Sequence, residues 1–386
     1  IAHHFTELRQ AVKNLGFPVL IRPSYVIGGR SMVILHDEHE LARYIHDNSE
    51  EVEWPLLIDR YLQGIECEAD VLSDGVDVFI PGLFEHIERA GVHSGDSISI
   101  FPAATIPDPL KRIIVDYTER IARALEIKGL MNIQFVIHNG TVYVLEVNPR
   151  ASRTVPIASK ITGIPLVDLA VKVQLGERLR EQKLPKGLLH EMPYFSVKVP
   201  VFSANKLTGT DPALGPEMKS TGEKLGLGFS VKDAFQKALG ISDGFLPYFK
   251  PRDSTVVCSI ANRDKPKALP LIRAIHESGY AISATAGTAR YLRRFGIPAQ
   301  ELTSFDDVRE RVFSGTCCAI LNIPTEGKRP HTFGFQLRAL ATEHHIPLFT
   351  CIETMELIWK YKPDKENHEP FVLPLASYRM RTFQNA

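Results

Sequence analysis

Cysteine is scarce in this sequence, with five residues among 386. They are Cys67, Cys258, Cys317, Cys318 and Cys351. An odd number without paired metal-ligand spacing argues against a disulfide framework and against a structural zinc site. We therefore expect reduced thiols in the core of a cytoplasmic protein.

Long apolar runs and an excess of one charge are also missing. No run reaches the ~18–20 residues that cross a bilayer, so we expect no membrane span. Lys and Arg together number 45, as do Asp and Glu, which argues against a nucleic-acid binder and an acidic disordered tail. The length suits two or three domains. The chain begins at Ile1 without a signal peptide, so we expect a piece of a longer protein.

Two patterns divide the chain. In the first part, short apolar runs alternate with amphipathic segments, and Asn139-Gly140 lies between two strand-like runs as a strong hairpin signal. From Ser254 onward strands and helices alternate with short turns, which predicts a parallel sheet covered on both faces. The predicted strands are 18–23, 32–35, 55–59, 66–72, 77–84, 132–138, 141–147, 256–260, 281–284, 318–323 and 347–351. The predicted helices are 38–48, 108–125, 167–176, 266–278, 288–295 and 332–343.

These patterns suggest two domains and a tail. We place the first domain at 1–250, with 178–250 as its closing segment and a bridge, because that stretch is rich in Gly, Pro and Lys. The second domain is 251–362. Residues 363–386 have little pattern and form the tail.

Three polar side chains lie at the end of the predicted hairpin. Glu146 and Asn148 are two apart, so they share a face of their strand, and Gln134 lies on the neighbouring strand. Oxygen ligands of this kind suit Mg²⁺ between protein and nucleotide phosphates. An exposed polar strand end is the simpler interpretation of Glu146 alone, but its apolar neighbours Val144 and Val147 predict buried surroundings.

Two arginines and two glycine-containing loops accompany this candidate metal site. Arg150 and Arg153 follow Asn148 closely, and arginine grips phosphate or carboxylate in a bidentate manner. Loops 24–30 and 91–96 are flexible enough to cover phosphates, although neither is a Walker A sequence. Together these features indicate phosphoryl transfer, which depends mainly on positioning and electrostatics.

The chain resembles the large subunit of carbamoyl-phosphate synthase over nearly all of residues 10–355. The stretches that carry the resemblance are 22–30 (RPSYVIGGR), 85–97 (EHIERAGVHSGDS), 129–135 (GLMNIQF), 146–156 (EVNPRASRTVP) and 214–223 (LGPEMKSTGE). The resemblance is to the C-terminal half of that subunit. It implies an N-terminally truncated α+β ATP-grasp domain, followed by an α/β Rossmann-like, methylglyoxal-synthase-like regulatory domain with a parallel sheet.

The resemblance also implies an activity and its site. This half of the family's subunit phosphorylates carbamate with ATP, giving carbamoyl phosphate for pyrimidine and arginine biosynthesis. The implied cofactors are ATP, Mg²⁺ or Mn²⁺, and K⁺. The implied metal ligands are Gln134, Glu146 and Asn148, and Arg150 and Arg153 hold phosphate and carbamate. The implied nucleotide contacts are Arg30, Arg60, Leu62, Glu66, Gly91, Val92, His93 and Ser94, with Gln134 and Glu146. Arg60 stands where the family more often has His.

The family's partners follow from the same resemblance. They are a glutaminase small subunit, the remaining N-terminal part of the large subunit and a nucleotide effector, in an oligomer without nucleic acid or membrane. The family's C-terminal half begins further upstream than Ile1, so we expect the present chain alone to be inactive.

The second domain carries a predicted effector site. Lys265 begins a helix, Thr285 and Thr288 flank another helix start, and Asn322 ends a strand, so all four gather at the carboxyl edge of the predicted sheet. An N-cap threonine in a tight turn is the structural alternative. The resemblance implies a nucleoside monophosphate effector. Val199 follows Ser196-Val197-Lys198 where ornithine-activated relatives carry Glu, which predicts little ornithine response.

Three other functions remain open at this stage. One is another ATP-grasp ligase, either a carboxylase or an amide-forming enzyme. A second is a non-catalytic nucleotide-binding regulatory fragment. A third is a lyase of the methylglyoxal synthase type, for which Asp264 is the available catalytic carboxylate.

Overall fold

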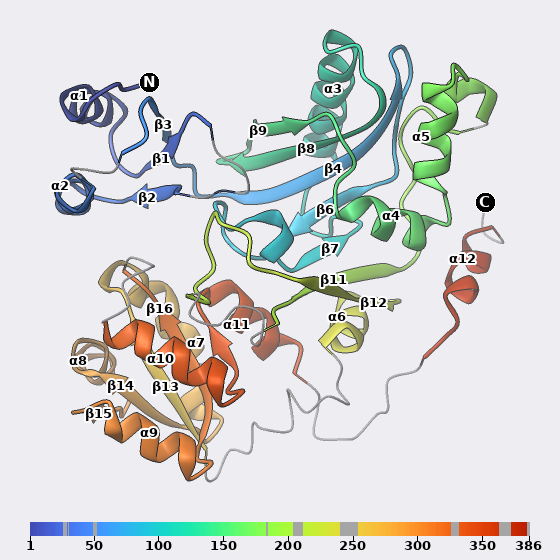
Figure 1. Ribbon diagram of the computed structural model, residues 1–386. Helices are drawn as coiled ribbons and strands as arrows, with labels where there is room; N and C mark the ends of the chain where they lie inside the picture. Colours follow the sequence, from blue (N-terminus) through green and yellow to red (C-terminus); the bar gives the residue numbers. More distant parts are fainter. Residues whose placement is uncertain are drawn as a thin grey trace.

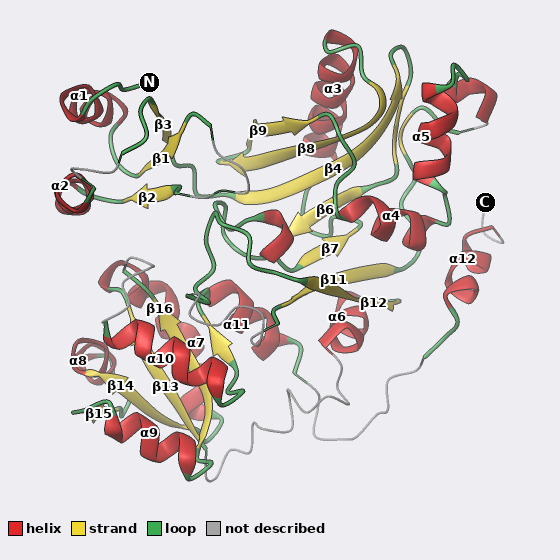
Figure 2. Cartoon of the chain, in the orientation of Figure 1, coloured by secondary structure: helices red, strands yellow, loops and turns green. Residues whose placement is uncertain are grey.

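Three sheets organise the part of the chain that the computed structural model describes, which is residues 1–25, 29, 31–48, 52–182, 184–203, 211–239, 254–325, 332–362 and 372–383. In Figure 1 a small sheet near the N-terminus and a large curved sheet lie above a parallel sheet. Figure 2 shows helices on both faces of the parallel sheet.

The small sheet is antiparallel, in the order β2-β1-β3. Its strands are β1 (Val19–Pro23), β2 (Val33–Leu35) and β3 (Leu56–Arg60). Helices α1 (Phe5–Leu15) and α2 (Glu38–Asp47) bury their apolar faces against it, since Leu8, Val12 and Leu41 join one core cluster with Val19 and Ile21. Helix α1 was not predicted from the sequence.

The large sheet has nine strands among the described residues. They are β4 (Ile65–Asp74), β5 (Val78–Ile80), β6 (Leu83–His86), β7 (Ser99–Phe101), β8 (Lys128–His138), β9 (Thr141–Asn148), β10 (Gly187–Leu188), β11 (Phe195–Val201) and β12 (Gly222–Gly228). The single strand predicted over 77–84 is wrong, because Pro81-Gly82 separates β5 from β6. Strand β4 pairs along its whole length with β8, which makes these two strands the frame of the sheet.

Helices cover both faces of this frame. On one face α3 (Asp108–Ala124) packs Ile114 and Ala122 against Cys67, Ala69 and Val71 of β4. The opposite face carries α4 (Thr154–Thr162) and α5 (Leu166–Gln174), which pack around Leu72. Helix α6 (Val231–Leu239) lies against β11 and β12. Where α4 and α5 do not cover it, this second face of β4 carries polar side chains.

The predicted hairpin is confirmed. Strands β8 and β9 join through Asn139 (φ 50°) and Gly140 (φ 75°), and positive φ at both central residues is the requirement of a type I′ turn. A bulge shifts the register, so that Gln134 faces Glu146 while Phe135 faces Val144. The bulge adds one residue to β9 and changes the direction of the end of that strand.

The third sheet is parallel, in the order β15-β14-β13-β16-β17. Its strands are β13 (Thr255–Ile260), β14 (Ala281–Thr285), β15 (Gln300–Leu302), β16 (Cys317–Ile323) and β17 (Leu348–Phe349). Its helices are α7 (Lys265–Glu277), α8 (Ala286–Arg294), α9 (Asp306–Phe313), α10 (Phe333–Glu343) and α11 (Ile352–Lys360). Helices α7, α8 and α11 pack on one face and α9 and α10 on the other, so both faces are covered, as predicted. Helices α9 and α11 themselves were not predicted from the sequence.

One core cluster joins the large sheet to the parallel sheet. It contains Ile100 and Val197 of the large sheet, Phe235 of α6, and Val256 and Cys258 of β13. Helix α12 (Leu375–Phe383), in the segment predicted as a tail, packs Tyr378 against Tyr194 with ring centroids 5.7 Å apart. The predicted boundary between 250 and 251 lies outside the described residues, and the division into domains stays a prediction.

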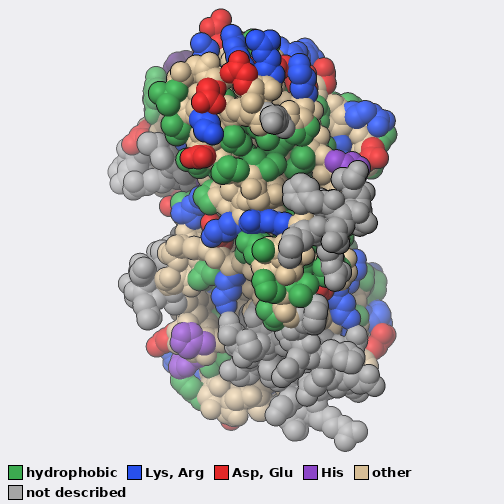
Figure 3. Space-filling model, turned by 90° about the vertical axis from the view of Figure 1, so that its right-hand side faces the viewer, with side chains coloured by type: hydrophobic (Ala, Val, Ile, Leu, Met, Phe, Trp, Pro, Cys, Tyr) green, Lys and Arg blue, Asp and Glu red, His purple; other side chains and the backbone are tan. Residues whose placement is uncertain are grey.

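Composition-based expectations have structural counterparts. All five cysteines are buried and free, as expected for reduced core thiols. On the face in Figure 3, Lys and Arg gather at the top together with Asp and Glu, above an exposed hydrophobic area. Within the described ranges no single helix has the length and apolarity to span a membrane, although α4 and α5, bent by 110°, pass as a pair on length and composition alone.

Candidate nucleotide and metal site

Two rows of polar side chains cross the second face of β4, β8 and β9. Strand pairing places Glu68 opposite Gln134 and Gln134 opposite Glu146. It also aligns Asp70, Asn132 and Asn148 in the neighbouring row. Directly opposed side chains on one sheet face lie within about 5.5 Å at their Cβ atoms. The hairpin therefore brings together the three residues predicted as metal ligands.

The contacts within the predicted metal set leave oxygen atoms available. Gln134 donates through Nε2 to Ser94 Oγ at 3.2 Å, and Asn148 donates through Nδ2 to Glu146 Oε1 at 2.8 Å. The amide oxygens of both residues, and the second oxygen of Glu146, are the ligands that a hard cation takes. Glu146 itself is exposed, with its neighbours Val144 and Leu145, so the buried surroundings expected from the apolar sequence are wrong. Among the described strands β9 pairs only with β8, which leaves β9 at an edge of the sheet.

Three buried carboxylates lie behind this set, and sequence analysis singled out only Glu66. Glu66, Glu68 and Asp70 alternate along β4 with the core residues Cys67 and Ala69. Burial raises the pKa of Glu66 to about 7 and that of Asp70 to about 6, the latter helped by the charge of Glu68. Acids at every second position of a buried strand were the signal that could have revealed them.

The carboxylate cluster has few positive partners. Asn132 donates to Glu68 at 3.2 Å and to Asp70 at 3.0 Å. His86 lies 3.5 Å from Glu68 Oε1, and the negative charges of Glu66 and Glu68 raise its pKa despite burial. Asp70 Oδ2 is buried without a hydrogen-bond partner. Among the described residues no group of three His, Cys, Asp or Glu is arranged as a metal centre. The amide and carboxylate oxygens nevertheless fit a cation shared with an anionic ligand.

The predicted adenosine loop is held close to this cluster. Gly91 donates its N–H to Glu66 Oε2 at 3.3 Å, while His93 Nδ1 accepts from the Gly95 N–H at 3.0 Å. A Cβ at Gly91 (φ 91°) would lie 2.9 Å from Ile34 and 3.1 Å from Tyr61, so the loop passes close to the small sheet. Burial lowers the pKa of His93, which favours its neutral, hydrogen-bonding form. Val92 is buried and Ser94 half-buried.

The predicted arginine contacts are arranged in different ways. Arg153 is exposed and donates to Ser220 Oγ at 3.2 Å, and exposed Arg150 donates to Ala151 O at 3.1 Å. Arg60 is exposed and donates instead to Leu15 O at the end of α1, at 3.1 Å. Arg30 lies outside the described residues, and Leu62 is half-buried. Arg153 therefore lies beside Ser220, within electrostatic reach of His93, and Arg60 is directed toward α1.

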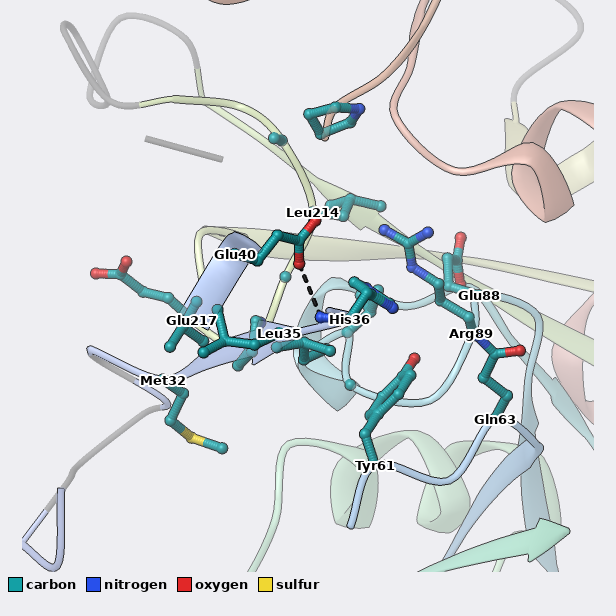
Figure 4. Close-up of a pocket in the computed structure, with 18 of the residues that line it drawn as sticks. Met32, Leu35, His36, Glu40, Tyr61, Gln63, Glu88, Arg89, Leu214 and Glu217 are labelled. Carbon is teal, nitrogen blue, oxygen red and sulfur yellow. Dashed lines mark hydrogen bonds between the residues drawn. The ribbon is translucent and has the colours of Figure 1, made fainter. Parts of the chain in front are cut away.

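A cavity of about 1200 Å³ opens beside the adenosine loop. Figure 4 shows Met32, Leu35 and His36, in or next to β2, on one side, and Tyr61, Glu88 and Arg89 on another. Glu40 accepts from the His36 N–H at 2.8 Å, and it also forms an ion pair with Arg263 at 2.7 Å. The cavity therefore lies between the small sheet, the large sheet and the second part of the chain.

Glu88, on the cavity wall, gives a pH-dependent prediction. Burial raises its pKa to about 7, although Ile98 N–H and Thr354 Oγ1 donate to it. The folded chain thus binds this proton more tightly than the unfolded chain, and stability falls as pH rises from about 4.5 to 7. We expect Glu88→Gln, which lacks the charge, to gain up to about 3 kcal/mol over wild type between pH 5 and pH 8. Urea unfolding at both pH values measures this gain. A stability difference that does not change with pH would refute it.

The predicted effector residues meet at the carboxyl edge of the parallel sheet. Lys265 donates through Nζ to Asn262 Oδ1 at 2.6 Å and to Gly287 O at 2.8 Å. Burial lowers the pKa of Lys265, helped by the positive charge of Arg290, which sequence analysis did not identify. Thr285 and Thr288 lie beside this lysine at the start of α8, their hydroxyls 3.3 Å apart.

Thr288 and Asn322, like Lys265, are engaged within the protein. Thr288 Oγ1 accepts from the Ile260 N–H at 3.1 Å. Asn322 is 2% exposed, donates to Ser259 O at 3.1 Å and accepts from Arg338 at 2.5 Å. Lys265, Thr288 and Asn322 are therefore buried and hydrogen-bonded within the protein, while Thr285 is half-buried.

Similarity to known proteins identifies the family. Residues 1–182 match the sequence model of the carbamoyl-phosphate synthase L chain, ATP binding domain, and residues 267–350 match the MGS-like domain. The carbamoyl phosphate synthase large chain of Thermoanaerobacter pseudethanolicus is 49% identical over 352 residues, which are 91% of this chain and 32% of that protein. The chain belongs to the carbamoyl phosphate synthase large-chain family.

Other large chains agree with this assignment. The one from Clostridium acetobutylicum is 45% identical over 353 residues, 90% of this chain and 32% of that protein. The chain thus spans about a third of the length of the curated large chains it matches. The predicted resemblance to the C-terminal half is confirmed, as is the fold class of an ATP-grasp part followed by a methylglyoxal-synthase-like parallel sheet.

Solved structures give only distant likenesses. The biotin carboxylase domain of the Hydrogenobacter thermophilus 2-oxoglutarate carboxylase has a TM-score of 0.44 and 21% identity, covering 53% of this chain and 46% of that one. An N5-carboxyaminoimidazole ribonucleotide synthetase has a TM-score of 0.48 and 17% identity, covering 62% and 65%. Likenesses of this size do not indicate a function.

Proposed function

We propose that this chain, as part of a full-length large chain, transfers the γ-phosphoryl group of ATP to carbamate, forming carbamoyl phosphate and ADP. A carbamate oxygen forms the new bond to the γ-phosphorus, and the bond from that phosphorus to the β,γ-bridging oxygen of ATP breaks, so that ADP leaves. The convergence of Gln134, Glu146 and Asn148 on one sheet face carries this proposal. Membership in the large-chain family favours this acceptor over those of other ATP-grasp ligases.

The cofactors follow from the same residues. ATP would place its adenosine between the small sheet and the 91–94 loop, and its phosphates toward Gln134 and Glu146. Mg²⁺ would be held by the oxygens of Gln134, Glu146 and Asn148, and Mn²⁺ suits the same ligands. The metal supplies charge neutralisation at the phosphates. Carboxylates in excess of nearby cations favour K⁺ as a further ion. Arg150 and Arg153 would hold phosphate and carbamate.

The reverse reaction tests this site without the rest of the pathway. We expect the full-length protein to form ATP from ADP and carbamoyl phosphate when Mg²⁺ is present, and to lose this activity with EDTA. A coupled hexokinase assay measures the ATP. ADP binding without ATP formation in the full-length protein would favour a non-catalytic nucleotide-binding role and overturn the proposal.

The second part of the chain is proposed to bind a nucleoside monophosphate effector through Lys265, Thr285, Thr288 and Asn322. Its support is the cationic, hydroxyl-lined start of α8 beside Lys265. The further proposed partners are a glutaminase small subunit and an N-terminal part of the large chain, in a cytoplasmic oligomer. Names of the related large chains support these partners.

A further inference from the structure

The turn at residues 149–153 carries both arginines that are proposed to hold phosphate and carbamate, Arg150 and Arg153. It joins the end of β9 to the start of α4. Both arginine side chains are exposed, so the positions of their guanidinium groups depend strongly on the backbone of this turn. Between them lies Ser152, which is half-buried. Its contacts show what holds the turn in place.

Ser152 is bonded to a buried carboxylate in the middle of the large sheet. Its hydroxyl donates to Asp70 Oδ1 at 2.5 Å, and Asn132 Nδ2 donates to the same oxygen at 3.0 Å. Asp70 lies on β4 and is 1% exposed. An ionised carboxylate can only accept, so the Ser152 hydroxyl is the donor in this bond. Hydrogen bonds of this kind to a charged acceptor are short and strong.

The same hydroxyl caps helix α4. Because its single proton points at Asp70, the Ser152 oxygen is left to accept. The N–H groups of Thr154 and Val155 donate to it at 3.0 Å and 3.3 Å. They are among the first N–H groups of α4, which have no partner within the helix. Asp70 therefore fixes the direction of the Ser152 hydroxyl, and the hydroxyl fixes the start of α4 directly after Arg153.

Asp70 is a destabilising residue for the interior of this sheet. Its donors Asn132 and Ser152 are neutral side chains, and its second oxygen, Oδ2, is buried without a hydrogen-bond partner. Burial and the charge of Glu68 raise its pKa to about 6, which shows that its surroundings disfavour the charged form. A residue that opposes folding yet organises the turn of a ligand site is the pattern expected of a functional position.

We propose that Asp70 and Ser152 are positioning residues, which hold the 149–153 turn so that Arg150 and Arg153 can grip the anionic substrate. The inference rests on the proposed function, since it names how the arginines of that site are held. Neither residue needs to touch the substrate, because Asp70 is buried and acts through the Ser152 hydroxyl.

Steady-state kinetics of ATP formation by the full-length protein test this inference. We expect Ser152→Ala to lower kcat/KM for carbamoyl phosphate by about 10-fold or more, a loss comparable to that of one hydrogen bond to a charged group. The KM for ADP should stay within about twofold of wild type, because the turn holds the other substrate. Ser152→Thr keeps the hydroxyl and should restore most of the lost kcat/KM.

A double-mutant cycle shows whether Asp70 acts through Ser152. Asp70→Asn keeps the size of the side chain and replaces the carboxylate with a weaker acceptor, so kcat/KM for carbamoyl phosphate should fall by about 5-fold or more. In the Ser152→Ala background the same substitution should add less than about twofold. A carboxylate that only supports the fold would lower kcat/KM equally in both backgrounds, and that result overturns the inference.

The large sheet supplies a matched control at Glu85. This buried carboxylate of β6 accepts from the Thr105 hydroxyl at 2.5 Å and from the Thr105 N–H at 2.7 Å. Thr105 lies between β7 and α3, outside the 149–153 turn. Thr105→Ala breaks the same kind of bond, so it should lower the urea midpoint and leave kcat/KM for carbamoyl phosphate unchanged. A kinetic loss as large as that of Ser152→Ala would mean that the effect is not specific to the turn, which overturns the inference.

Phosphate binding separates this inference from the proposed reaction. Calorimetry of the full-length protein with inorganic phosphate and MgADP measures the binding that Arg153→Gln abolishes, and Ser152→Ala should weaken this binding by about 10-fold. A wild type that forms no ATP, while this weakening is observed, counts against the reaction alone. An active wild type with the same kcat/KM and phosphate affinity as Ser152→Ala overturns the inference alone. A wild type that neither forms ATP nor binds phosphate overturns both.

Discussion

Replacing Glu146 with Gln should lower ATP formation from ADP and carbamoyl phosphate by about 1000-fold or more, equivalent to about 4 kcal/mol of transition-state stabilisation. The substitution removes the one carboxylate of the predicted metal set and keeps the size of the side chain. Because Glu146 is exposed on the edge strand β9, the variant should unfold at the same urea concentration as wild type. The coupled ATP assay and urea unfolding together make the measurement.

A second exposed carboxylate serves as the control for this prediction. Glu177 lies in the turn beyond α5 and is exposed, and Glu177→Gln should retain wild-type activity. Unchanged turnover in Glu146→Gln would remove this residue from the metal set. Loss of activity accompanied by loss of folding would mean that the side chain supports the hairpin instead.

Replacing Gly226 with Ala should destabilise the protein by more than about 3 kcal/mol. Strand β12 passes so close to α6 that a Cβ here would lie 2.1 Å from Ala234 O and 2.4 Å from Ala238 N. Both atoms belong to the helix backbone, which cannot turn aside as a flexible side chain would. The helix must move off the sheet, and this disrupts the core cluster around Phe235. Urea unfolding measures the loss.

The same strand supplies a matched control. Gly222 also lies on β12, and a Cβ there would meet no atom within 4 Å. Gly222→Ala should change stability by less than about 1 kcal/mol, because only the lost freedom of the unfolded chain is altered. Equal effects at the two positions would show that the cost belongs to the strand conformation and not to the approach of α6.

Local sequence patterns predicted the elements that form the site, but not how deeply they are buried. Asn139-Gly140 determined the β8–β9 hairpin, and period-two spacing placed Glu146 and Asn148 on one face. Burial of Glu146 was misjudged, because its exposure depends on which strand borders the sheet. The order of strands in a sheet determines which strand lies at its edge, and the residue pattern of a single strand does not reveal that order.

Contacts between distant segments were beyond the reach of local patterns. Nothing around Arg338 predicts that it pairs with Asp211, which is 127 residues away in sequence. Arg60 was assigned by its position in a motif, while its guanidinium reaches Leu15 O across the small sheet. Helices α1 and α12 were missed for a related reason: their short amphipathic stretches gain stability from packing and little from local propensity.

The apolar cluster shared by Ile100, Val197, Phe235 and Val256 has an energetic consequence. Unfolding of the parallel sheet would expose the apolar side chains that the large sheet contributes to this cluster. We therefore expect the two sheets to unfold in one thermal transition. A small molecule that binds tightly to one of them therefore protects both against heat by mass action. Ligand binding at either sheet should therefore raise the unfolding temperature of the whole protein.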